Sequence, residues 1–192
     1  MKKSRDGSSF SNNPEKKSAR VVRLQDYQEG KEREEAMEQA ARLLQQTRNL
    51  MEKNCRIYAE HLEQLDIDLA DYEEEDRFVL VGEQTLEENP EVSASFMIQF
   101  NLEQPVIDIH MIFTPNGTLK HRQKLYRVIN SWNQDYRFAA FFIDSDNDLV
   151  VRTSLDVEHH FEPAKLDEAL ILLSDLADDG YTEVEKFWVK EL

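Results

Sequence analysis

The sequence predicts an α+β fold in which a largely antiparallel, five-stranded sheet packs against helices in the order α-βββ-α-ββ-α. Three observations lead to this prediction. A long run of helix formers precedes the first strand pattern. Three strand patterns then follow one another with short connections, and one helical pattern separates them from two further strands and a last helix. Strands joined by hairpin-length connections favour antiparallel pairing over a doubly wound parallel sheet.

The charge of the chain is strongly acidic and unevenly distributed. The 192 residues carry a formal net charge of −16, but residues 1–30 contain seven basic and four acidic residues, so the rest of the chain carries −19. A body this acidic repels phosphate backbones and anionic membrane surfaces. We therefore expect neither nucleic acid nor a membrane among its partners.

The distribution of apolar residues and cysteine predicts a cytoplasmic protein. No apolar stretch approaches the roughly 20 residues needed to cross a bilayer, and the N-terminus lacks the apolar segment of a secretory signal. Cys55 is the only cysteine, which excludes an intramolecular disulfide. Because Cys55 lies on an apolar helical stripe, we expect a small buried hydrophobic residue rather than a nucleophile.

Residues 1–30 are predicted to be a disordered basic tail, and residues 31–192 a single α+β domain. The tail is rich in Ser, Asn, Lys, Arg and Gly, with Phe10 and Tyr27 as its only aromatic residues. Such a segment buries too little apolar surface to offset the entropy of ordering it. The same composition leaves open a basic arm that binds an acidic partner or the protein's own acidic body.

A long helix is predicted from Lys31 to Leu65, because helix formers dominate and neither Gly nor Pro interrupts them. If continuous, it spans on the order of 50 Å, more than a sheet of short strands can cover. It therefore either breaks near Lys53 and Asn54 or packs its first half against something else. We expect residues 31–53 to form a helical extension and residues 54–192 to form the core. The apolar positions advance by threes and fours: Met37, Ala40, Leu44, Thr47, Met51, Cys55, Tyr58, Leu62 and Leu65.

The middle of the chain contains three strand patterns followed by a helix. The acidic run Asp71–Asp76 precedes them and is predicted to be a solvated loop. The second and third strands alternate apolar and polar side chains, as expected of strands with one buried face. A Pro-Asn-Gly sequence ends the third strand. The predicted segments are 78–81, 93–102 and 106–113 for the strands and 119–132 for the helix.

The stretch from Tyr126 to Val157 is expected to contain the end of this helix, a turn and two strands. Trp132 lies on the apolar stripe of the helix and is predicted to be a core anchor. The unbroken apolar run Phe138–Ile143 is typical of a strand covered on both faces. From Leu149 the chain alternates, which predicts a strand with one wetter face.

The C-terminal part predicts a helix that begins at Pro163, because Pro is favoured at the first helical position. Leucines at helical spacing make its buried stripe. Asp178 and Gly180 are predicted to end it, and Thr182 and Glu185 form a capping-box pattern for a short last helix.

This second half resembles YbjN-like proteins, a bacterial family described as sensory transduction regulators and similar in fold to type III secretion chaperones. The resemblance covers roughly Cys55 to Trp188. It implies a type III secretion chaperone-like fold and supplies no catalytic residues to carry over. One departure is the hairpin, which has Asn147 and Asp148 where a turn glycine is common. The matching residues are Asn130, Trp132, Asn133, Arg137, Phe138–Asp144, Leu149–Asp156 and the helix from Pro163.

Two clusters resemble metal sites, and both are better interpreted otherwise. The Asp144-x-Asp146-x-Asp148 spacing imitates an EF-hand, but the sixth position is Leu149 instead of Gly, which favours a hairpin turn. The adjacent His159 and His160 lie beside acidic residues, yet neighbouring residues of a strand point apart. No metal or cofactor is therefore predicted.

Two classes of function remain open. The first is a non-catalytic protein-binding module, chaperone-like or regulatory, whose partner is another protein or a second copy in a homodimer. The second is an enzyme whose acid/base site is built on His110 and Asp108, which share a strand face. The plainer interpretation of that pair is that it belongs to a polar, solvent-exposed face of the strand. Because the long helix outruns the sheet, its apolar stripe is the candidate partner-binding surface, with Met37, Leu44 and Met51 as its residues.

Overall fold

The computed structural model describes residues 14–67, 69–115 and 117–189. The chain divides between Leu43 and Leu44 into two compact units, unit 1 (Met1–Leu43) and unit 2 (Leu44–Leu192), which are described separately. The described part of unit 1 is the first part of helix α1 (Pro14–Gln64). The predicted boundaries at residues 30 and 53 do not coincide with this division.

Helix α1 begins earlier than predicted and has no break. It starts at Pro14, inside the segment predicted to be a tail, and continues through Lys53 and Asn54. Pro is tolerated in the first turn, and the residues after it include good helix formers, whose local propensity the composition argument did not weigh. The prediction for residues 1–13 lies outside the described residues.

Unit 2 is an α+β domain built on a six-stranded antiparallel sheet of order β1-β2-β3-β4-β7-β6. The predicted fold class is confirmed, although the prediction had five strands. A separate two-stranded ribbon pairs β5 (Thr118–Leu119) with β8 (Trp188–Val189). The strands of the large sheet are β1 (Ala70–Glu73), β2 (Arg77–Thr85), β3 (Ser93–Asn101), β4 (Val106–Ile112), β6 (Ala140–Ile143) and β7 (Leu149–Asp156), and the helices are the end of α1, α2 (Arg122–Asp135) and α3 (Pro163–Val184).

The additional strand β1 lies in the acidic run that was predicted to be a loop. It pairs with β2 in the register Tyr72↔Val79, and all four of its residues are exposed. Charged side chains are a common feature of edge strands, because they discourage pairing with other chains. An acidic edge strand has too few apolar residues to show the alternation on which the prediction depended.

The apolar sequence of β6 predicted a strand that is covered on both faces, and this prediction is wrong. Strand β6 forms the other edge of the sheet, and most of its side chains are only partly buried. Only Phe141 is buried within β6, and Phe138, just before the strand, is 51% exposed. Strand β7 follows the prediction more closely. Val151 is buried and Arg152 is exposed, and the two residues point to opposite faces.

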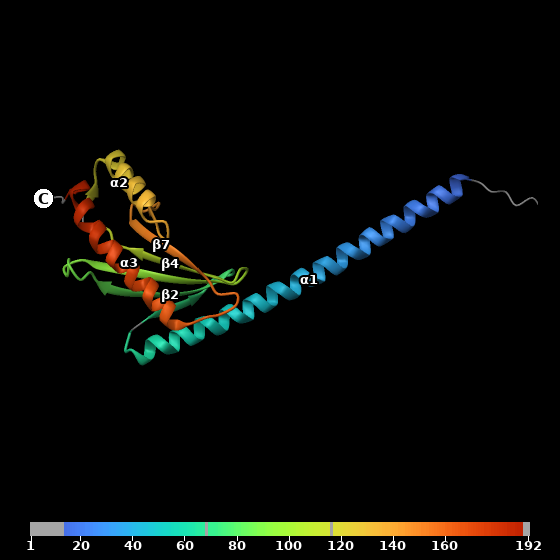
Figure 1. Cartoon of the computed structure of the whole chain (residues 1–192), viewed down its shortest axis with the longest axis horizontal. Coiled ribbons are helices and arrows are strands. Elements are labelled where there is room, and N and C mark those ends of the chain that lie inside the picture. The colour runs from blue at the N-terminus through green and yellow to red at the C-terminus, as the bar shows by residue number, and fades with distance from the viewer. Residues whose placement is uncertain (1–13, 68, 116, 190–192) are drawn as a thin grey trace, which may run out of the picture. The chain divides into compact units, whose positions relative to one another are not determined.

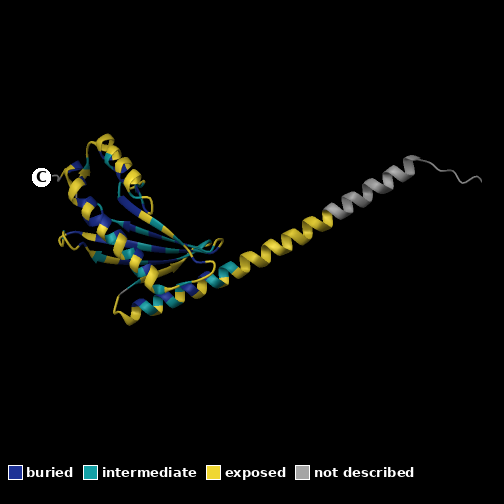
Figure 2. Ribbon diagram, in the orientation of Figure 1, coloured by how far each residue is buried: buried dark blue, intermediate teal, exposed yellow. Residues whose placement is uncertain are grey.

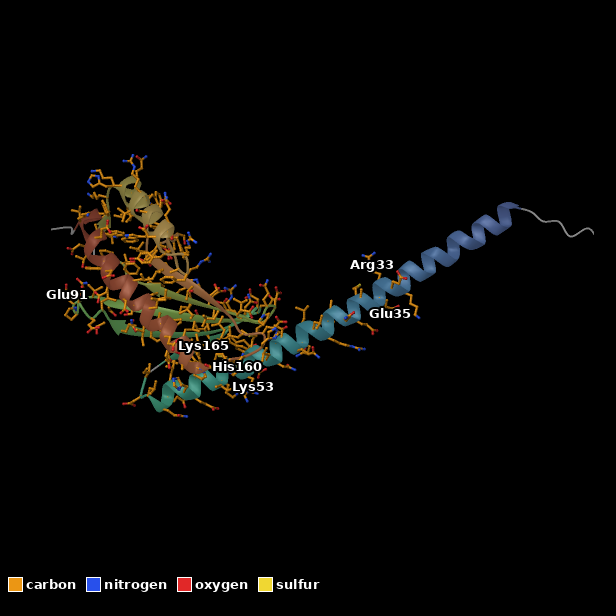
Figure 3. All side chains as sticks on the ribbon, viewed as in Figure 1. Arg33, Glu35, Lys53, Glu91, His160 and Lys165 are labelled. Carbon is orange, nitrogen blue, oxygen red and sulfur yellow. The ribbon has the colours of Figure 1, made fainter. Side chains whose placement is uncertain are left out.

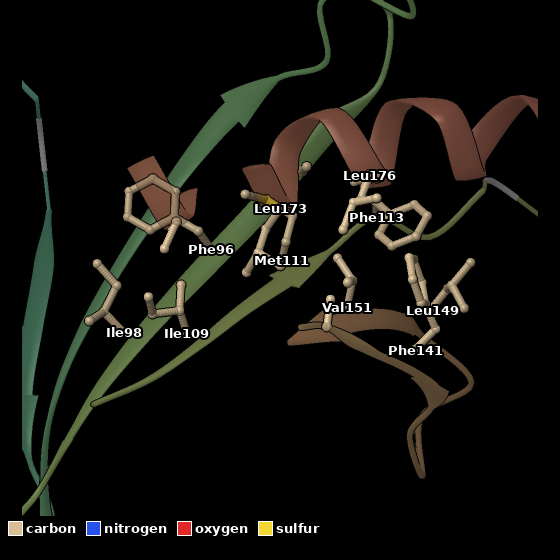
Figure 4. Packing of buried hydrophobic residues seen from close by; sticks show 14 of the residues in the cluster. Phe96, Ile98, Ile109, Met111, Phe113, Phe141, Leu149, Val151, Leu173 and Leu176 are labelled. Carbon is tan, nitrogen blue, oxygen red and sulfur yellow. The ribbon is translucent and has the colours of Figure 1, made fainter. Parts of the chain in front are cut away.

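One hydrophobic core lies between the sheet and the helices. Helix α3 crosses one face of the sheet (Figure 1), and its Leu173 and Leu176 face Met111 of β4 and Phe113, which directly follows β4 (Figure 4). Residues coloured as buried occur on both the strands and the helices of unit 2 (Figure 2). The same cluster includes buried apolar side chains from all three helices: Met51, Tyr58 and Leu62 of α1, Leu125, Ile129 and Trp132 of α2, and Leu166, Leu173 and Leu176 of α3.

Trp132 is a core residue, as predicted. It is 9% exposed, and its ring centroid lies 4.9 Å from that of Phe141. The indole Nε1–H donates a hydrogen bond of 3.0 Å to Glu183 Oε2. A buried indole needs such a partner for its polar N–H.

Helix α3 passes through the predicted stop and continues to Val184. Gly180 is buried inside the helix, and a Cβ atom there would lie 3.2 Å from the Trp132 ring and 3.4 Å from Phe113. This glycine permits close packing rather than ending the helix. The predicted capping box is also wrong, because Glu185–Phe187 form a 3-10 turn that directly follows α3.

No helix among the described residues is both long and apolar enough to span a bilayer.

Candidate protein-binding surfaces

Exposed apolar side chains on α1 are the first candidate surface. In unit 1, Met37 is 67% exposed and Leu43 is 56% exposed, and in unit 2 Leu44 is 50% exposed. The predicted set of Met37, Leu44 and Met51 needs one correction. Met51 is fully buried in the core of unit 2, because α1 packs onto that core from Met51 onward, so it is unavailable to a partner. Leu43 was not predicted and is as exposed as its neighbour.

The rest of this part of α1 is charged and exposed. Residues 30–46 are all exposed (Figure 2), and side chains such as Arg33 and Glu35 project outward (Figure 3). Lys31 pairs with Glu35 at 3.5 Å, and Arg42 pairs with Glu38 at 3.6 Å, both at the i,i+4 spacing. Exposed pairs of this kind stabilise a helix by only a few tenths of a kcal/mol, about 0.3–0.5 each. These ion pairs account for the charged side chains of this part of α1. They do not account for the exposure of Met37, Leu43 and Leu44.

The face of the sheet turned away from the core is the second candidate surface. We call it the open face, because its buried members Val79 and Val150 lie outside the hydrophobic cluster that the helices share with the sheet. It mixes apolar and polar side chains, most of them half-buried. Its residues are Tyr72, Val79, Val81, Met97, Gln99, Asp108, His110, Ile112, Phe142, Val150, Arg152 and Ser154.

His110 and Asp108 lie on the open face, and no hydrogen bond joins them in the described part of the chain. The Ser154 hydroxyl donates to Asp108 Oδ1, and His110 Nδ1 has no hydrogen-bond partner among the described residues. Burial lowers the pKa of His110; Arg152 acts in the same direction, whereas Asp108 opposes it. The imidazole is therefore neutral near pH 7, and no carboxylate orients it for proton transfer.

The other clusters singled out in the sequence are a hairpin turn and two exposed histidines. Asp144 Oδ1 accepts hydrogen bonds from the backbone N–H groups of Asp146, at 2.9 Å, and Asp148, at 2.8 Å. It thus closes the β6–β7 hairpin, with Asn147 in the left-handed conformation at φ 72°. His159 and His160 are exposed, and no group of three potential metal-ligating side chains occurs among the described residues.

A polar triad that the sequence analysis missed joins α1 to α3. Asp167 of α3 accepts a hydrogen bond of 2.9 Å from the Tyr58 hydroxyl and lies 2.8 Å from His61 Nε2 through its second oxygen. Burial, and then the hydrogen bond to Asp167, raise the pKa of Tyr58. A protonated Tyr58 is the donor that this contact requires. The triad fixes the end of α1 against the start of α3, and its members lie too far apart in the sequence for a local pattern to reveal it.

The two edges of the sheet differ in how they are covered. At β6, the Asn133 side chain contacts the Phe141 backbone in both directions. Phe141 N–H donates to Asn133 Oδ1 at 2.7 Å, and Asn133 Nδ2 donates to the Phe141 carbonyl at 2.9 Å. The amide thus replaces a neighbouring peptide group and blocks this edge. This explains one residue of the Asn-x-Trp-Asn pattern, since Asn133 closes the edge while Trp132 packs in the core.

At the other edge, the pairing of β1 with β2 among the described residues covers only part of β2. Their pairing runs from Glu73↔Phe78 to Ala70↔Val81, while β2 continues to Thr85. A hollow of about 600 Å³ lies where β1 begins, and it is lined by Asp66, Ile67, Leu69, Ala70, Val81, Gly82 and Glu83. All of these residues belong to unit 2.

Comparison with known proteins connects this geometry to a family. The model of the YbjN family, described as "Putative bacterial sensory transduction regulator", matches residues 59–186. Among curated proteins none matches the chain. Two solved structures are similar to it. A chain of the crystal structure of the ExsC-ExsE complex has a TM-score of 0.53 at 13% identity, covering 72% of this chain and 96% of that one. The crystal structure of YbjN from E. coli, titled a putative transcription regulator, has a TM-score of 0.44 at 15% identity, covering 68% and 91%.

The similarity to the ExsC-ExsE structure confirms that unit 2 has the type III secretion chaperone-like fold that the sequence resemblance implied. At 13% identity it establishes the fold alone.

Proposed function

The chain belongs to the YbjN family, and from this premise we propose that it is a non-catalytic protein-binding module, chaperone-like or regulatory, that acts in the bacterial cytoplasm. The observation that carries the proposal is the exposure of large apolar side chains on α1, with Met37 67% exposed and Leu44 50% exposed. Apolar side chains gathered on one helix are typical of binding surfaces. The fold of a chaperone that was crystallised in a complex with another protein supports the same class of function.

Self-association into a homodimer is the resting state we propose. Met37 and Leu44 are seven residues apart in the sequence, the spacing at which helical side chains recur on one face. A second copy of the chain offers the same stripe, and a symmetric contact is the commonest way for identical chains to bury one. The acidic excess outside residues 1–30 favours basic segments on any other partner.

The catalytic alternative gains no support from the geometry. Its two residues, His110 and Asp108, lie on a sheet face without a hydrogen bond between them, and the Asp108 carboxylate is engaged by Ser154. A general base requires an orienting neighbour and a place for substrate beside it. The described hollows are lined by other residues.

Sedimentation of the full chain at several concentrations tests the proposal. Wild type is expected to form dimers, and Met37→Glu or Leu44→Glu to shift the equilibrium towards monomer, because a carboxylate in a desolvated contact costs several kcal/mol unless it is paired. Gln39→Glu and Gln46→Glu are matched controls, since both positions are exposed on the same helix and receive the same charge. An invariant monomer, or equal effects of all four substitutions, contradicts self-association through this stripe.

A further inference from the structure

We propose that the outer face of helix α2, together with Lys120 directly before it, is a basic surface that binds a short acidic segment of a partner protein. The inference rests on the proposed protein-binding function and extends it to a second surface, whose charge preference is opposite to that of the acidic body. It does not depend on self-association through α1, and its test can fail while the dimer test succeeds.

The charge of this region is opposite to that of the chain as a whole. Residues 120–137 contain five basic residues and one acidic residue, in a chain whose formal net charge is −16. All six are exposed, and most of α2 is coloured accordingly in Figure 2. The basic residues are Lys120, Arg122, Lys124, Arg127 and Arg137, and the acidic residue is Asp135. A cationic surface of this kind attracts anionic ligands.

The five basic side chains have no partner in the described part of the chain. None of them forms an ion pair or a side-chain hydrogen bond there, whereas Arg42 and Arg56 of α1 each pair with a glutamate one turn away. The carboxylate of Glu183 in α3 is bonded to the Trp132 indole at 3.0 Å, and Asp135 lies at the far end of α2. The positive charge is therefore left for a ligand to compensate.

These residues lie at the end of α2 where basic side chains are least favourable. Arg122 and Lys124 are in the first turn, which contains no acidic residue, and His121 at the N-cap position makes no side-chain capping hydrogen bond. The N-terminus of a helix carries a partial positive charge, so basic side chains there destabilise the helix. Departures of this kind from local preference are expected at functional sites. An acidic ligand would compensate both the side chains and the helix end.

The packing of α2 holds this surface in a fixed orientation. Before the helix, the Lys120 N–H donates to the Phe187 carbonyl at 2.7 Å, beside the ribbon of β5 and β8. Within the helix, Lys124 and Arg127 are three residues apart, a spacing at which side chains are neighbours on the helix surface. The surface therefore lies on a rigid element, which favours precise binding. The opposite side of α2 is buried in the core by three side chains, those of Leu125, Ile129 and Trp132.

Exposed aromatic side chains accompany the basic residues. Tyr126 is 41% exposed and lies one helical turn after Arg122, and Phe138 is 51% exposed and directly follows Arg137. Aromatic and Arg side chains are enriched in the central part of protein–protein interfaces and among the residues that contribute most to binding. The segment that fits this surface therefore carries apolar side chains among its carboxylates.

The length of the surface favours a short protein segment over a nucleic acid. The 14 residues of α2 span about 21 Å, and at physiological salt charges act over about 8 Å. A short segment bound along α2 stays within reach of the basic side chains. A long polyanion extends past them to the acidic body, which repels its phosphates. Two copies of the chain repel each other through the same acidic excess, which disfavours a second copy as the ligand.

Binding of synthetic peptides to the full chain tests the proposal. The probe is a short labelled peptide of alternating Glu and Leu, followed by fluorescence anisotropy. One control peptide has Gln in place of Glu, and a second has Ser in place of Leu. Wild-type protein is expected to bind the Glu-Leu peptide with an affinity that falls as salt is raised, and to bind the Gln control at least about tenfold more weakly. The Ser control should also bind more weakly, because it lacks apolar contacts.

A charge reversal with a matched control locates the site. Lys124→Glu is expected to raise the Kd about fivefold or more, whereas Lys53→Glu, the same substitution at an exposed position of α1 in unit 2, leaves it unchanged. Because an acidic residue in the first turn stabilises a helix, weaker binding by Lys124→Glu would not reflect loss of α2. Tyr126→Ala is expected to raise the Kd about threefold. In wild type, the amide chemical shifts of residues 120–127 should change when the peptide is added, a measurement that needs no variant.

Several outcomes overturn the proposal. Absence of binding, or equal binding of the Gln peptide, excludes an acidic segment as the ligand, and equal effects of Lys124→Glu and Lys53→Glu exclude α2 as its site. Tighter binding of a single-stranded RNA of equal charge, abolished by Lys124→Glu, would assign the surface to nucleic acid. Salt-sensitive self-association abolished by the same variant would assign it to a second copy. If the peptide fails to bind while Leu44→Glu still dissociates dimers, this proposal fails and the proposed function stands.

Discussion

At the scale of single residues, Trp132 shows how strongly one buried aromatic side chain connects the elements of unit 2. Its ring packs on Phe141 and against Gly180, and its N–H is bonded to Glu183. We expect Trp132→Ala to lower the free energy of unfolding by about 3–5 kcal/mol. Urea denaturation measures this, with Tyr126→Ala, a 41% exposed aromatic on the same helix, as the control. Similar midpoints for the two variants would contradict a core role.

Asn133 carries the second residue-scale prediction. Asn133→Ala exposes the Phe141 N–H and C=O at the β6 edge and is expected to cost about 0.5–1.5 kcal/mol, because water replaces part of the lost bonding. It should also promote self-association through the freed edge. Asn133→Asp is the comparison, since it keeps the acceptor for Phe141 N–H and replaces the donor with a carboxylate oxygen that faces the Phe141 carbonyl. Light scattering that stays flat for the alanine variant argues against an edge-blocking role.

Cys55 provides a pH-dependent prediction. Burial, and then the carboxylate of Asp71, raise the pKa of Cys55 from 9.0 to about 11. Because the thiolate is the reactive form, alkylation at about pH 9 should be slower in the folded protein than in urea. The folded pKa lies above the unfolded one, so the contribution to stability is complete below about pH 9 and is lost as the pH rises towards about 11. Mass spectrometry of the alkylation time course and melting curves across this range measure both effects; equal alkylation rates contradict the prediction.

At the scale of elements, the periodic strands and helices could be predicted from the sequence, and the elements defined by distant contacts could not. The alternation in β3, β4 and β7 reports one buried face directly. Strand β1 has no such signal, because its acidic side chains are all exposed. The end of α3 was predicted too early because Gly180 looks like a stop signal, and its real role depends on Trp132, 48 positions away in the sequence.

The candidate binding surface could likewise be predicted only in part from the sequence. Leu44 and Met51 belong to one apolar stripe in the sequence, and only the packing of α1 separates an exposed residue from a fully buried one. The closure of the β6 edge by Asn133 was also beyond the sequence, because it depends on an amide from another element.

The contact between α1 and α3 carries the element-scale prediction. Asp167→Ala removes the partner of both Tyr58 and His61 and is expected to cost about 1–3 kcal/mol, since the hydroxyl of the buried Tyr58 is then left without an acceptor. Tyr58→Phe removes one donor and leaves no unsatisfied group on that side, so a smaller loss of about 0.5–1.5 kcal/mol is expected. Chemical denaturation of both variants measures the difference. A larger loss for Tyr58→Phe would mean that ring packing, not the triad, fixes α1.

At the scale of the whole molecule, the division at Leu43 separates the proposed self-association from the folded core. Within residues 30–64 of α1, whose burial the structure describes, every buried side chain lies at or after Met51, in unit 2. A chain that lacks residues 1–43 therefore retains the whole hydrophobic cluster and the Tyr58–Asp167–His61 triad.

We expect this shortened chain to unfold at the same urea concentration as the full chain, because exposed helix contributes little to the free energy of unfolding of the packed unit. It should also sediment as a monomer, since it lacks Met37 and Leu43 and retains Leu44 only at its new N-terminus. The first turn of a helix frays, so a Leu44 side chain at the new N-terminus cannot be held in a fixed contact with a second copy. A shortened chain that still dimerises would move the self-association surface into unit 2, to its open face or a sheet edge. A clearly lower midpoint would show that residues 1–43 support the fold.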